Sequence, residues 1–353
     1  MRLLRTSTLA AAMTTLAATS ACHRHRHHEP SPGALLYTSD EEGGFIIAVD
    51  PKTSAVAARI PVGKRPRGVK VSHDGNWLYV ALSGSPRGGP GIDESKLPPP
   101  DRRADGIGVV NLHTRKLARI LESGDDPETF DFSPDGSTLY VSNEDAAQMA
   151  VLDVASGKVR AHVDVGPEPE GVTVRPDGKV VFVTSEAGSE VTAIDTKTLA
   201  VVGHMPTGPR PRTVVFTKDG TIGFVADEFA AKLNVLDAVA FKTIGEIPLH
   251  EDSPMPSGPR PMGQVLSPDG TLLYVACGRG ASVAIVDVAK RQQVRSIDGA
   301  GDRPWGIALS PDGKTLYTAN GTSHDVSIIN LGTGNVDKRV TVGGSPWGAA
   351  LGF

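Results

Sequence analysis

A short strand–turn–strand unit recurs through most of this sequence. Around Asp135-Gly136 and Asp312-Gly313, apolar and polar residues alternate on both sides of an Asp-Gly pair. This pattern is typical of a β-hairpin, because an Asp-Gly pair suits the backbone of a tight turn. The same unit returns at Asp74, Asp177, Asp219 and Asp269. A strand pattern that repeats about every 40 residues predicts a propeller or a solenoid.

The repeats add up to seven blades of four strands. Six whole units begin near Pro66, Pro127, Pro169, Pro211, Pro261 and Pro304. Three strand patterns at 34–60 precede them, and one opening strand at 346–353 follows them, which together make a seventh blade. A blade built from both ends adds backbone hydrogen bonds across the seam of the ring. We therefore predict an all-β fold over residues 33–353: a seven-bladed β-propeller of four-stranded antiparallel blades, closed by a blade that the N- and C-termini share.

Two insertions interrupt the regular spacing of the repeats. They occupy residues 83–105 and 248–258, where the steps between Asp-Gly pairs lengthen. We name the strands of a blade A to D from the centre outward. The first insertion then lies in a B–C loop and the second in a D–A connection, and both kinds of connection lie on one face. Elaboration confined to one face of a repeat protein predicts the binding face.

Two columns of residues are expected to converge on the centre of that face. The first column is the residue after each repeat proline: Arg67, Glu128, Glu170, Arg212, Met262, Trp305 and Trp347. The second column follows strand B: Asp40 and Glu41, Ser83, Asn143 and Glu144, Ser185 and Glu186, Asp227 and Glu228, Cys277, and Asn320. From these columns we predict eleven ligand-binding residues: Arg67, Glu128, Glu144, Glu170, Glu186, Arg212, Asp227, Glu228, Met262, Trp305 and Trp347.

The chemistry of these columns leaves several alternatives open. Arginines and carboxylates on one arc and apolar residues on the other suit a small organic ligand with an anionic or hydroxyl end. The crowded carboxylates could instead bind Ca²⁺ or hold a proton for acid–base work. The opposite charges could also do no more than neutralise one another around a water-lined centre. Glu144, Glu186 and Arg212 are the candidate catalytic residues if the protein is an enzyme.

The first 32 residues predict export. A basic start (Met1 to Arg5), an apolar stretch and a small-residue zone are typical of a signal peptide over residues 1–21. Cys22 follows directly and resembles a lipidation site. We expect residues 22–32 to form a flexible, His-rich tether, and the protein to be a bacterial periplasmic or outer-membrane lipoprotein. His23, His25, His27 and His28 of this tether are further candidates for metal ligands.

Bulk composition excludes some classes of partner. The net charge is −4, so no general attraction to nucleic acid or anionic membranes is expected. Two cysteines in unlike contexts do not predict a disulfide framework. We expect a monomer that meets a membrane only through a lipid on Cys22. No haem-attachment, zinc-protease, phosphate-loop or nucleophile-elbow motif is found.

The repeat resembles a known family. Leu139 to Asn143, Leu273 to Ala276 and Leu316 to Asn320, each behind Ser-Pro-Asp-Gly, are similar to the YVTN family of bacterial β-propeller repeats. The resemblance implies an exported seven-bladed propeller. Some relatives are associated with pyrroloquinoline-quinone-dependent catabolism, although family membership does not fix one chemistry. Neighbouring families include lactonases of the 6-phosphogluconolactonase type, which use glutamate and arginine at the channel.

Three functions follow as hypotheses. The first is a non-enzymatic propeller that binds a small ligand or a periplasmic protein on the face of the D–A and B–C loops. The second is a lactonase-type hydrolase with a channel glutamate as general base and an arginine that holds the oxyanion. The third is a pure protein-interaction scaffold. No cofactor is evident; Ca²⁺ and pyrroloquinoline quinone are the two that the sequence leaves open.

Overall fold

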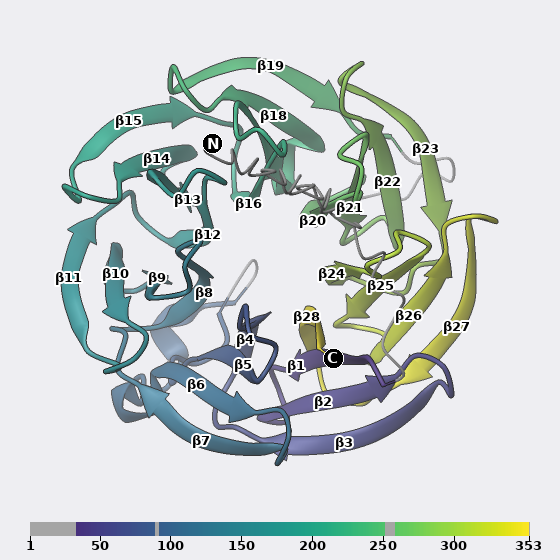
Figure 1. Ribbon diagram of the computed structural model, residues 1–353, viewed down its shortest axis with the longest axis horizontal. Coiled ribbons are helices and arrows are strands. Elements are labelled where there is room, and N and C mark those ends of the chain that lie inside the picture. Colours follow the sequence, from purple (N-terminus) through teal and green to yellow (C-terminus); the bar gives the residue numbers. More distant parts are fainter. Residues whose placement is uncertain (1–32, 89–91, 251–257, 353) are drawn as a thin grey trace, which may run out of the picture.

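The computed structural model describes residues 33–88, 92–250 and 258–352. The predicted signal peptide, Cys22 and the His-rich tether lie outside these residues. Seven four-stranded antiparallel sheets surround a common axis, as Figure 1 shows. The predicted seven-bladed propeller is therefore confirmed. Among the described residues, no helix is long and apolar enough to span a membrane.

The innermost strand of every blade begins at the repeat proline. These A strands are β4 (Pro66–Val71), β8 (Pro127–Phe132), β12 (Pro169–Val174), β16 (Pro211–Phe216), β20 (Pro261–Leu266), β24 (Pro304–Leu309) and β28 (Pro346–Gly352). Proline suits the first residue of a strand, because it has no N–H to donate to the ladder.

The two middle strands of each blade form the core. The B strands are β1 (Leu35–Asp40), β5 (Trp77–Leu82), β9 (Thr138–Asn143), β13 (Val180–Ser185), β17 (Ile222–Asp227), β21 (Leu272–Cys277) and β25 (Thr315–Asn320). The C strands are β2 (Phe45–Asp50), β6 (Gly106–Asn111), β10 (Gln148–Asp153), β14 (Glu190–Asp195), β18 (Lys232–Asp237), β22 (Ser282–Asp287) and β26 (Asp325–Asn330). Their residues are almost all buried, because each blade is covered by a neighbour on both faces.

The outermost strands alternate between partly buried and exposed residues. These D strands are β3 (Ala55–Pro61), β7 (Lys116–Leu121), β11 (Val159–Asp164), β15 (Val201–Pro206), β19 (Lys242–Pro248), β23 (Gln292–Asp298) and β27 (Asn335–Thr341). Charged side chains on them, such as Arg119 and Lys338, face solvent along an otherwise open sheet edge. Such residues protect an edge strand from pairing with another chain.

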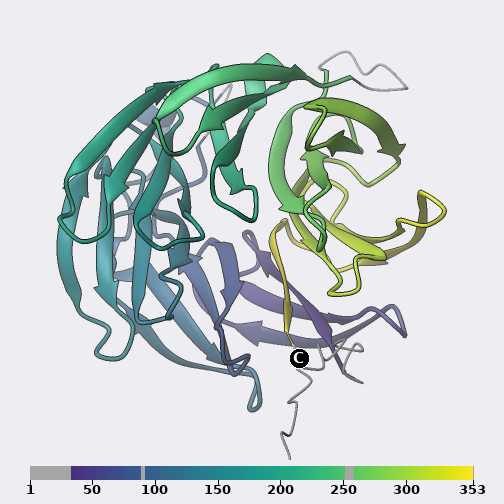
Figure 2. The same ribbon diagram turned by 45° about the horizontal axis from the view of Figure 1, so that its top comes forward.

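The closing blade joins residues from both ends of the chain. Its strand order is β28-β1-β2-β3, and Figure 2 shows β28 lying beside β1. The buried carboxylate of Asp40 reinforces this seam, because its Oδ1 accepts hydrogen bonds from the N–H groups of Ser345 (2.8 Å) and Gly43 (2.9 Å). The backbone N–H of Glu41 donates to the Ser345 carbonyl at 3.0 Å. The predicted sharing of one blade is thus confirmed.

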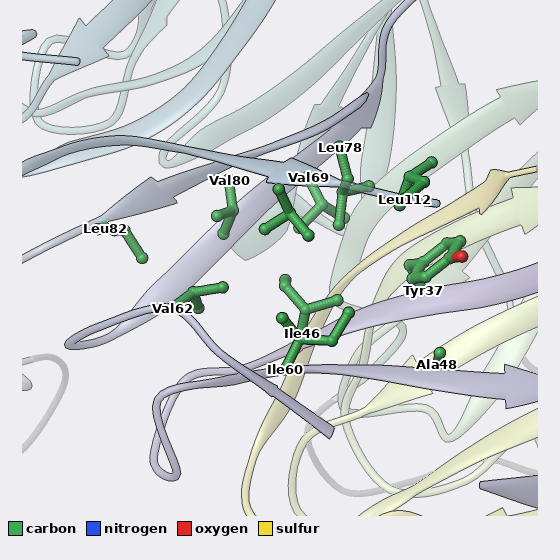
Figure 3. Packing of buried hydrophobic residues seen from close by; sticks show 11 residues of the cluster. Tyr37, Ile46, Ala48, Ile60, Val62, Val69, Leu78, Val80, Leu82 and Leu112 are labelled. Carbon is green, nitrogen blue, oxygen red and sulfur yellow. The ribbon is translucent and has the colours of Figure 1, made fainter. Parts of the chain in front are cut away.

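Hydrophobic clusters fill the spaces between neighbouring blades. One of them joins the closing blade to the blade of β4–β7, and Figure 3 shows Ile46 and Ile60 turned toward Val69 and Val80. All four side chains are buried. Because β-branched residues fit a pleated surface, their enrichment in these strands suits face-to-face packing of sheets.

Aspartates shape the turns at both ends of the hairpins. In the A–B turns, Asp135 Oδ1 accepts hydrogen bonds from Ser133 Oγ (2.6 Å) and the Ser137 N–H (3.0 Å), and Gly136 has a φ of 72°. At the end of strand C, Asp50 Oδ1 accepts from the Lys52 N–H at 2.8 Å. Asp135 therefore forms a turn, as its Asp-Gly pair predicts, and Asp50 forms one at the other end of the hairpin.

The start of each A strand carries an irregularity that the sequence does not reveal. The register against strand B shifts just after the repeat proline in every blade, for example between Pro66 and Val69 and between Pro211 and Val214. A β-bulge re-aims the side chains within it. In all seven blades the bulge spans the residue that follows the proline, which is the first column of predicted site residues.

Small residues next to this column allow the central strands to approach closely. A Cβ on Gly171 would lie 2.1 Å from the carbonyl oxygen of Arg212 in the next blade. That carbonyl accepts a hydrogen bond from Thr184 Oγ1 at 2.8 Å. In another blade a threonine takes the glycine's place, and Thr129 Oγ1 donates to the Glu170 carbonyl at 2.6 Å. The backbones of Arg212 and Glu170 are thus held by the preceding blade.

Both insertions lie on the face of the B–C and D–A connections. Residues 83–105 connect β5 to β6 and include the 3-10 helices η1 (Glu94–Lys96) and η2 (Arg102–Ala104). The second insertion connects β19 to β20, and its residues 251–257 lie outside the described part. A third 3-10 helix, η3 (Glu228–Ala230), follows β17 on the same face.

We predict that Asp40→Ala weakens the seam. Removal of the carboxylate leaves the buried Ser345 N–H without its acceptor, so the free energy of unfolding should fall by about 1–3 kcal/mol. Urea denaturation measures this change. Asp50→Ala is the matched control, because Asp50 accepts similar hydrogen bonds at an exposed turn where water can replace it. Equal losses in the two variants would contradict this role for Asp40.

Candidate functional site

The centre of the insertion-bearing face is hollow. The cavity there has a volume of about 1040 Å³. Its described lining includes eight carboxylates (Glu41, Asp126, Glu128, Glu144, Asp145, Glu168, Glu170 and Glu186) and eight arginines (Arg65, Arg67, Arg87, Arg102, Arg210, Arg212, Arg279 and Arg303). Ser85, Arg87, Ile92 and Leu97 to Pro100 of the first insertion also line it. This insertion therefore forms part of the cavity wall.

Arg67 is the centre of one group of charges. Its side chain is only 3% exposed, and its guanidinium contacts the carboxylates of Asp126 and Glu128. The Glu144 carboxylate lies 3.6 Å from Arg67 Nη1 and is 27% exposed. Asp126 also accepts a hydrogen bond from Ser83 Oγ. Three carboxylates thus surround one guanidinium, and Glu144 is the most exposed of them.

Arg212 is the centre of a second group. Its Nη1 contacts Glu186 and lies 2.6 Å from Glu170, while its Nε and Nη2 donate to Glu228 at 2.9 and 2.6 Å. Arg210 joins this group, with its Nη2 2.5 Å from Glu186 and its Nε 3.2 Å from Glu228. Three carboxylates therefore share two guanidiniums.

This group carries one more negative than positive charge, which favours the uptake of a proton. Burial raises the pKa of Glu186 to about 10; Arg212 opposes this rise and Glu170 adds to it. Burial also disfavours the charged form of Glu170, yet Arg212 beside it holds the pKa of Glu170 below its usual value. Glu170 and Glu186 lie beside the same guanidinium and interact with one another, so we infer that the extra proton belongs to this pair of carboxyl groups.

Glu144 has the pKa best suited to proton transfer near neutral pH. Burial raises the pKa of Glu144 to about 7, Arg67 opposes the rise, and Asp126 and Glu170 add to it. A carboxylate with a pKa near the working pH can both accept and return a proton. Unlike Glu186, whose side chain is 3% exposed, Glu144 remains accessible from the cavity.

Aromatic residues form another part of the wall. The indole rings of Trp305 and Trp347 stack with centroids 5.4 Å apart and an interplanar angle of 25°. The guanidiniums of Arg212 and Arg303 lie 5.0 and 4.8 Å from a Trp305 ring centroid. Cation–π contacts of this kind fix the guanidinium planes against the rings.

The structure places the eleven predicted residues as follows. Arg67, Glu128, Glu144, Glu170, Glu186, Arg212, Trp305 and Trp347 line the cavity. Glu228 is not among the described lining residues but contacts Arg212. Asp227 and Met262 are buried away from the described lining. Asp227 instead accepts hydrogen bonds from the Gly208 N–H and from Asn234, which bind it into the scaffold.

The sequence reasoning missed a third column, the residue before the repeat proline. Arg65, Asp126, Glu168, Arg210 and Arg303 occupy this position and all line the cavity. Each has a positive φ, between 38° and 59°. This conformation is uncommon for residues other than glycine and is further disfavoured before proline. The alternation of Arg, Asp and Glu at one repeat position is the signal that could have found it.

The acidic cluster at Arg67 offers the oxygen ligands that Ca²⁺ prefers. Oxygen atoms of Asp126, Glu128 and Glu144 lie within 4.8 Å of one another. However, the guanidinium of Arg67 already pairs with all three carboxylates. A bound cation would have to share these ligands with that positive charge. Ca²⁺ and pyrroloquinoline quinone therefore stay predictions.

Solved structures with similar folds come from several bacteria. Hydrazine synthase of Kuenenia stuttgartiensis is 22% identical over 84% of this chain and 92% of that chain, with a TM-score of 0.70. The periplasmic gluconolactonase PpgL of Pseudomonas aeruginosa is 21% identical over 91% and 99%, with a TM-score of 0.71. A putative 6-phosphogluconolactonase of Bacteroides fragilis is 16% identical over 92% and 99%, also with a TM-score of 0.71. At these identities the likeness shows the fold alone.

Sequence comparison gives a more specific result. No curated protein matches the sequence significantly. The family model described as "Lactonase, 7-bladed beta-propeller" matches residues 35–176 and 176–346. The propeller implied by the YVTN resemblance is confirmed, whereas the YVTN assignment and the association with pyrroloquinoline quinone stay predictions. The chain belongs to the seven-bladed β-propeller lactonase family.

Proposed function

We propose that this protein is a lactonase-type hydrolase, the second of the three hypotheses raised by the sequence. The observation that carries the proposal is the position of Glu144, a partly exposed carboxylate beside a buried guanidinium in the central cavity. Family membership supports the same reading. The periplasmic gluconolactonase and the putative 6-phosphogluconolactonase among the similar folds are consistent with it.

The reaction would begin with a water molecule between Glu144 and the lactone carbonyl. The Glu144 carboxylate takes a proton from this water while the water oxygen forms a bond to the carbonyl carbon. The resulting oxyanion would lie in the field of the cavity arginines. Arg210 is a suitable contact, because its side chain is 25% exposed whereas that of Arg212 is 5% exposed. The ring C–O bond then breaks, and the proton on Glu144 passes to the leaving oxygen to give a hydroxy acid.

Arg67 would tune Glu144 and not contact the substrate. Its guanidinium is fixed by Asp126 and Glu128 and lies 3.6 Å from Glu144. This positive charge prevents the pKa of Glu144 from rising further through burial. Glu186 is a poorer candidate for the base, because both of its oxygens already face guanidiniums.

Export of the protein remains part of the proposal. The predicted signal peptide and Cys22 support a periplasmic or lipid-anchored location, and one similar fold belongs to a periplasmic gluconolactonase. A non-enzymatic ligand-binding protein would use the same cavity. The measurement of turnover separates these two readings, since only the lactonase opens the ring.

We predict that Glu144→Gln abolishes most lactone hydrolysis. The amide cannot accept a proton, so kcat/KM for D-glucono-1,5-lactone should fall by about 10²- to 10⁴-fold. Initial rates are measured above the spontaneous rate with the full chain. Glu122→Gln is the matched control, because Glu122 is exposed on a D–A connection and is not among the described lining residues. A wild-type protein that hydrolyses no lactone, or a Glu144→Gln variant with full activity, would overturn the proposal.

The pH dependence of the free energy of unfolding should reveal the titration of Glu144. Folding raises the pKa of Glu144 from 4.5 to about 7, so the folded state binds more protons than the unfolded state between these values. The free energy of unfolding should therefore decrease as pH rises from about 4.5 to about 7. Glu144→Gln should flatten this decrease, as measured by urea denaturation at several pH values. Parallel curves for the two proteins would show that Glu144 does not titrate as described.

A further inference from the structure

The apolar residues of the cavity wall lie in one part of the ring. Trp305 and Trp347 are the second residues of β24 and β28. The other described apolar lining residues all belong to the first insertion: Pro86, Ile92, Leu97, Pro98, Pro99 and Pro100. This insertion extends from the blade of β4–β7, and β4 lies beside β28 (Figure 1). These residues therefore occupy neighbouring positions around the ring, and we call them the apolar arc.

The base of the insertion is fixed, so its apolar residues have a defined place. The Asp101 N–H donates to the Gly84 carbonyl at 2.9 Å, which joins the two arms of the loop. A Cβ on Gly84 would lie 1.8 Å from the Asp101 carbonyl oxygen, so the arms meet closely. Arg102 Nη2 lies 2.6 Å from the carboxylate of Asp145 in the next blade. The prolines at 98–100 further restrict the backbone, because each fixes its own φ.

The apolar arc exposes hydrocarbon surface to the cavity, whereas charges close to it pair with one another. Arg65 Nη2 lies 3.0 Å and Arg87 Nε 3.7 Å from oxygens of Glu41. Ile92 is 45% exposed, and both tryptophans are partly exposed. Apolar surface that faces water in a cavity favours a ligand that covers it with apolar groups.

The arc leads toward Glu144. This residue follows β9, and its blade is the next one around the ring after the blade that carries the insertion (Figure 1). The cavity volume of about 1040 Å³ is at the upper end of the range for small-molecule sites, roughly 300–1,000 Å³. A single lactone ring would fill only part of it. A lactone with its carbonyl at Glu144 therefore has room for a substituent along the arc.

We propose that the apolar arc is a subsite for an alkyl or aryl substituent of a lactone. The identity of the ligand as a lactone rests on the proposed function. Indole faces, proline rings and the side chains of Ile92 and Leu97 offer apolar surface to such a group. A lactone with hydroxyl groups at these positions would lose hydrogen bonds to water without replacement. The preferred substrates are therefore lactones with a hydrocarbon substituent.

The length of an alkyl substituent tests the subsite. We expect kcat/KM of the full chain to rise about fourfold for each methylene added from δ-hexalactone to δ-decalactone, because each added methylene is buried against the arc. The gain should appear as a lower KM with little change in kcat, since the substituent lies away from the reacting carbonyl. Dihydrocoumarin, whose lactone is fused to a benzene ring, shows whether the arc favours an aryl group or a flexible chain.

The Ile92→Ser variant removes part of the arc. We expect kcat/KM for δ-decalactone to fall about 3- to 10-fold, while that for δ-valerolactone, which has no substituent, changes little. Ile120→Ser is the matched control, because Ile120 is 47% exposed on β7 of the same blade and is not among the described lining residues. Trp347→Ala should lower the rate for δ-decalactone further. If that variant does not fold, Ile92→Ser decides, because Ile92 is exposed on a loop.

Binding of a neutral apolar probe tests the subsite without turnover. The fluorescence of N-phenyl-1-naphthylamine increases when apolar surroundings replace water. We expect this probe to bind the full chain, and its affinity to weaken about 3- to 10-fold in Ile92→Ser but not in Ile120→Ser. No binding of the probe, or equal affinities in the two Ser variants, would contradict the subsite.

Turnover separates this inference from the proposed function. Hydrolysis of δ-valerolactone and δ-decalactone with equal kcat/KM would keep the lactonase and reject the subsite. Probe binding that depends on Ile92, without hydrolysis of any lactone, would keep the arc as an apolar binding site and reject the lactonase.

Discussion

Hydrogen bonds from the A and B strands of one blade to the A strand of the next blade position the backbone at the centre of the ring. The carbonyl of Arg212 is held by Thr184 of the preceding blade, and the carbonyl of Glu170 by Ser142 and Thr129. Gly171 lets the strands come this close, because a Cβ there would overlap the Arg212 carbonyl. The backbone under Arg212 and under Glu170 is therefore fixed by a different blade from its own. A site built this way is rigid without any covalent cross-link.

Rigidity matters because the centre concentrates charges that would otherwise be costly to bury. Removing ions from water costs several kcal/mol each, and their attraction offsets this only when the geometry is good. Arg212 satisfies this condition through contacts with Glu170, Glu186 and Glu228. All eight cations among the described lining residues are arginines, whose planar donors can serve several carboxylates at once. The same fixed charges would stabilise a developing oxyanion without first having to reorient.

Most of the fold could be predicted from the sequence, because each blade repeats the same local signals. The Asp-Gly turns, the prolines at the start of the A strands and the apolar middle strands gave both the blade count and the shared blade. The predicted binding face also carries the cavity. The first and second columns placed Arg67, Glu144 and Arg212 at the centre, since repeat position fixes the direction of a side chain.

The remaining details depend on bulges and on contacts between blades, which have no signature within one repeat. Residues before the prolines were missed because an X–Pro pair ordinarily predicts an extended connection, not a left-handed residue that lines a cavity. Asp227 ends strand B as Asn143 does, yet hydrogen bonds from Gly208 and Asn234 hold its carboxylate in the scaffold. The partnering of each arginine likewise depends on residues from other blades. Sequence position alone could not show that Arg212 contacts three carboxylates whereas the guanidinium of Arg303 lies over the Trp305 ring.

The shared blade also determines when the central cavity can form during folding. Asp40 and Ser345, which meet at the seam, are 305 residues apart. Bringing together such distant segments costs loop-closure entropy that short-range hairpins do not incur. Hairpins within the other blades can form as each becomes available, but the ring cannot close until residues 346–352 pair with β1. Trp347 belongs to that last strand, so the wall of the cavity is completed only when the ring itself is complete. An incompletely synthesised chain would therefore present charged and aromatic groups in separate blades, without the enclosed site that brings them together.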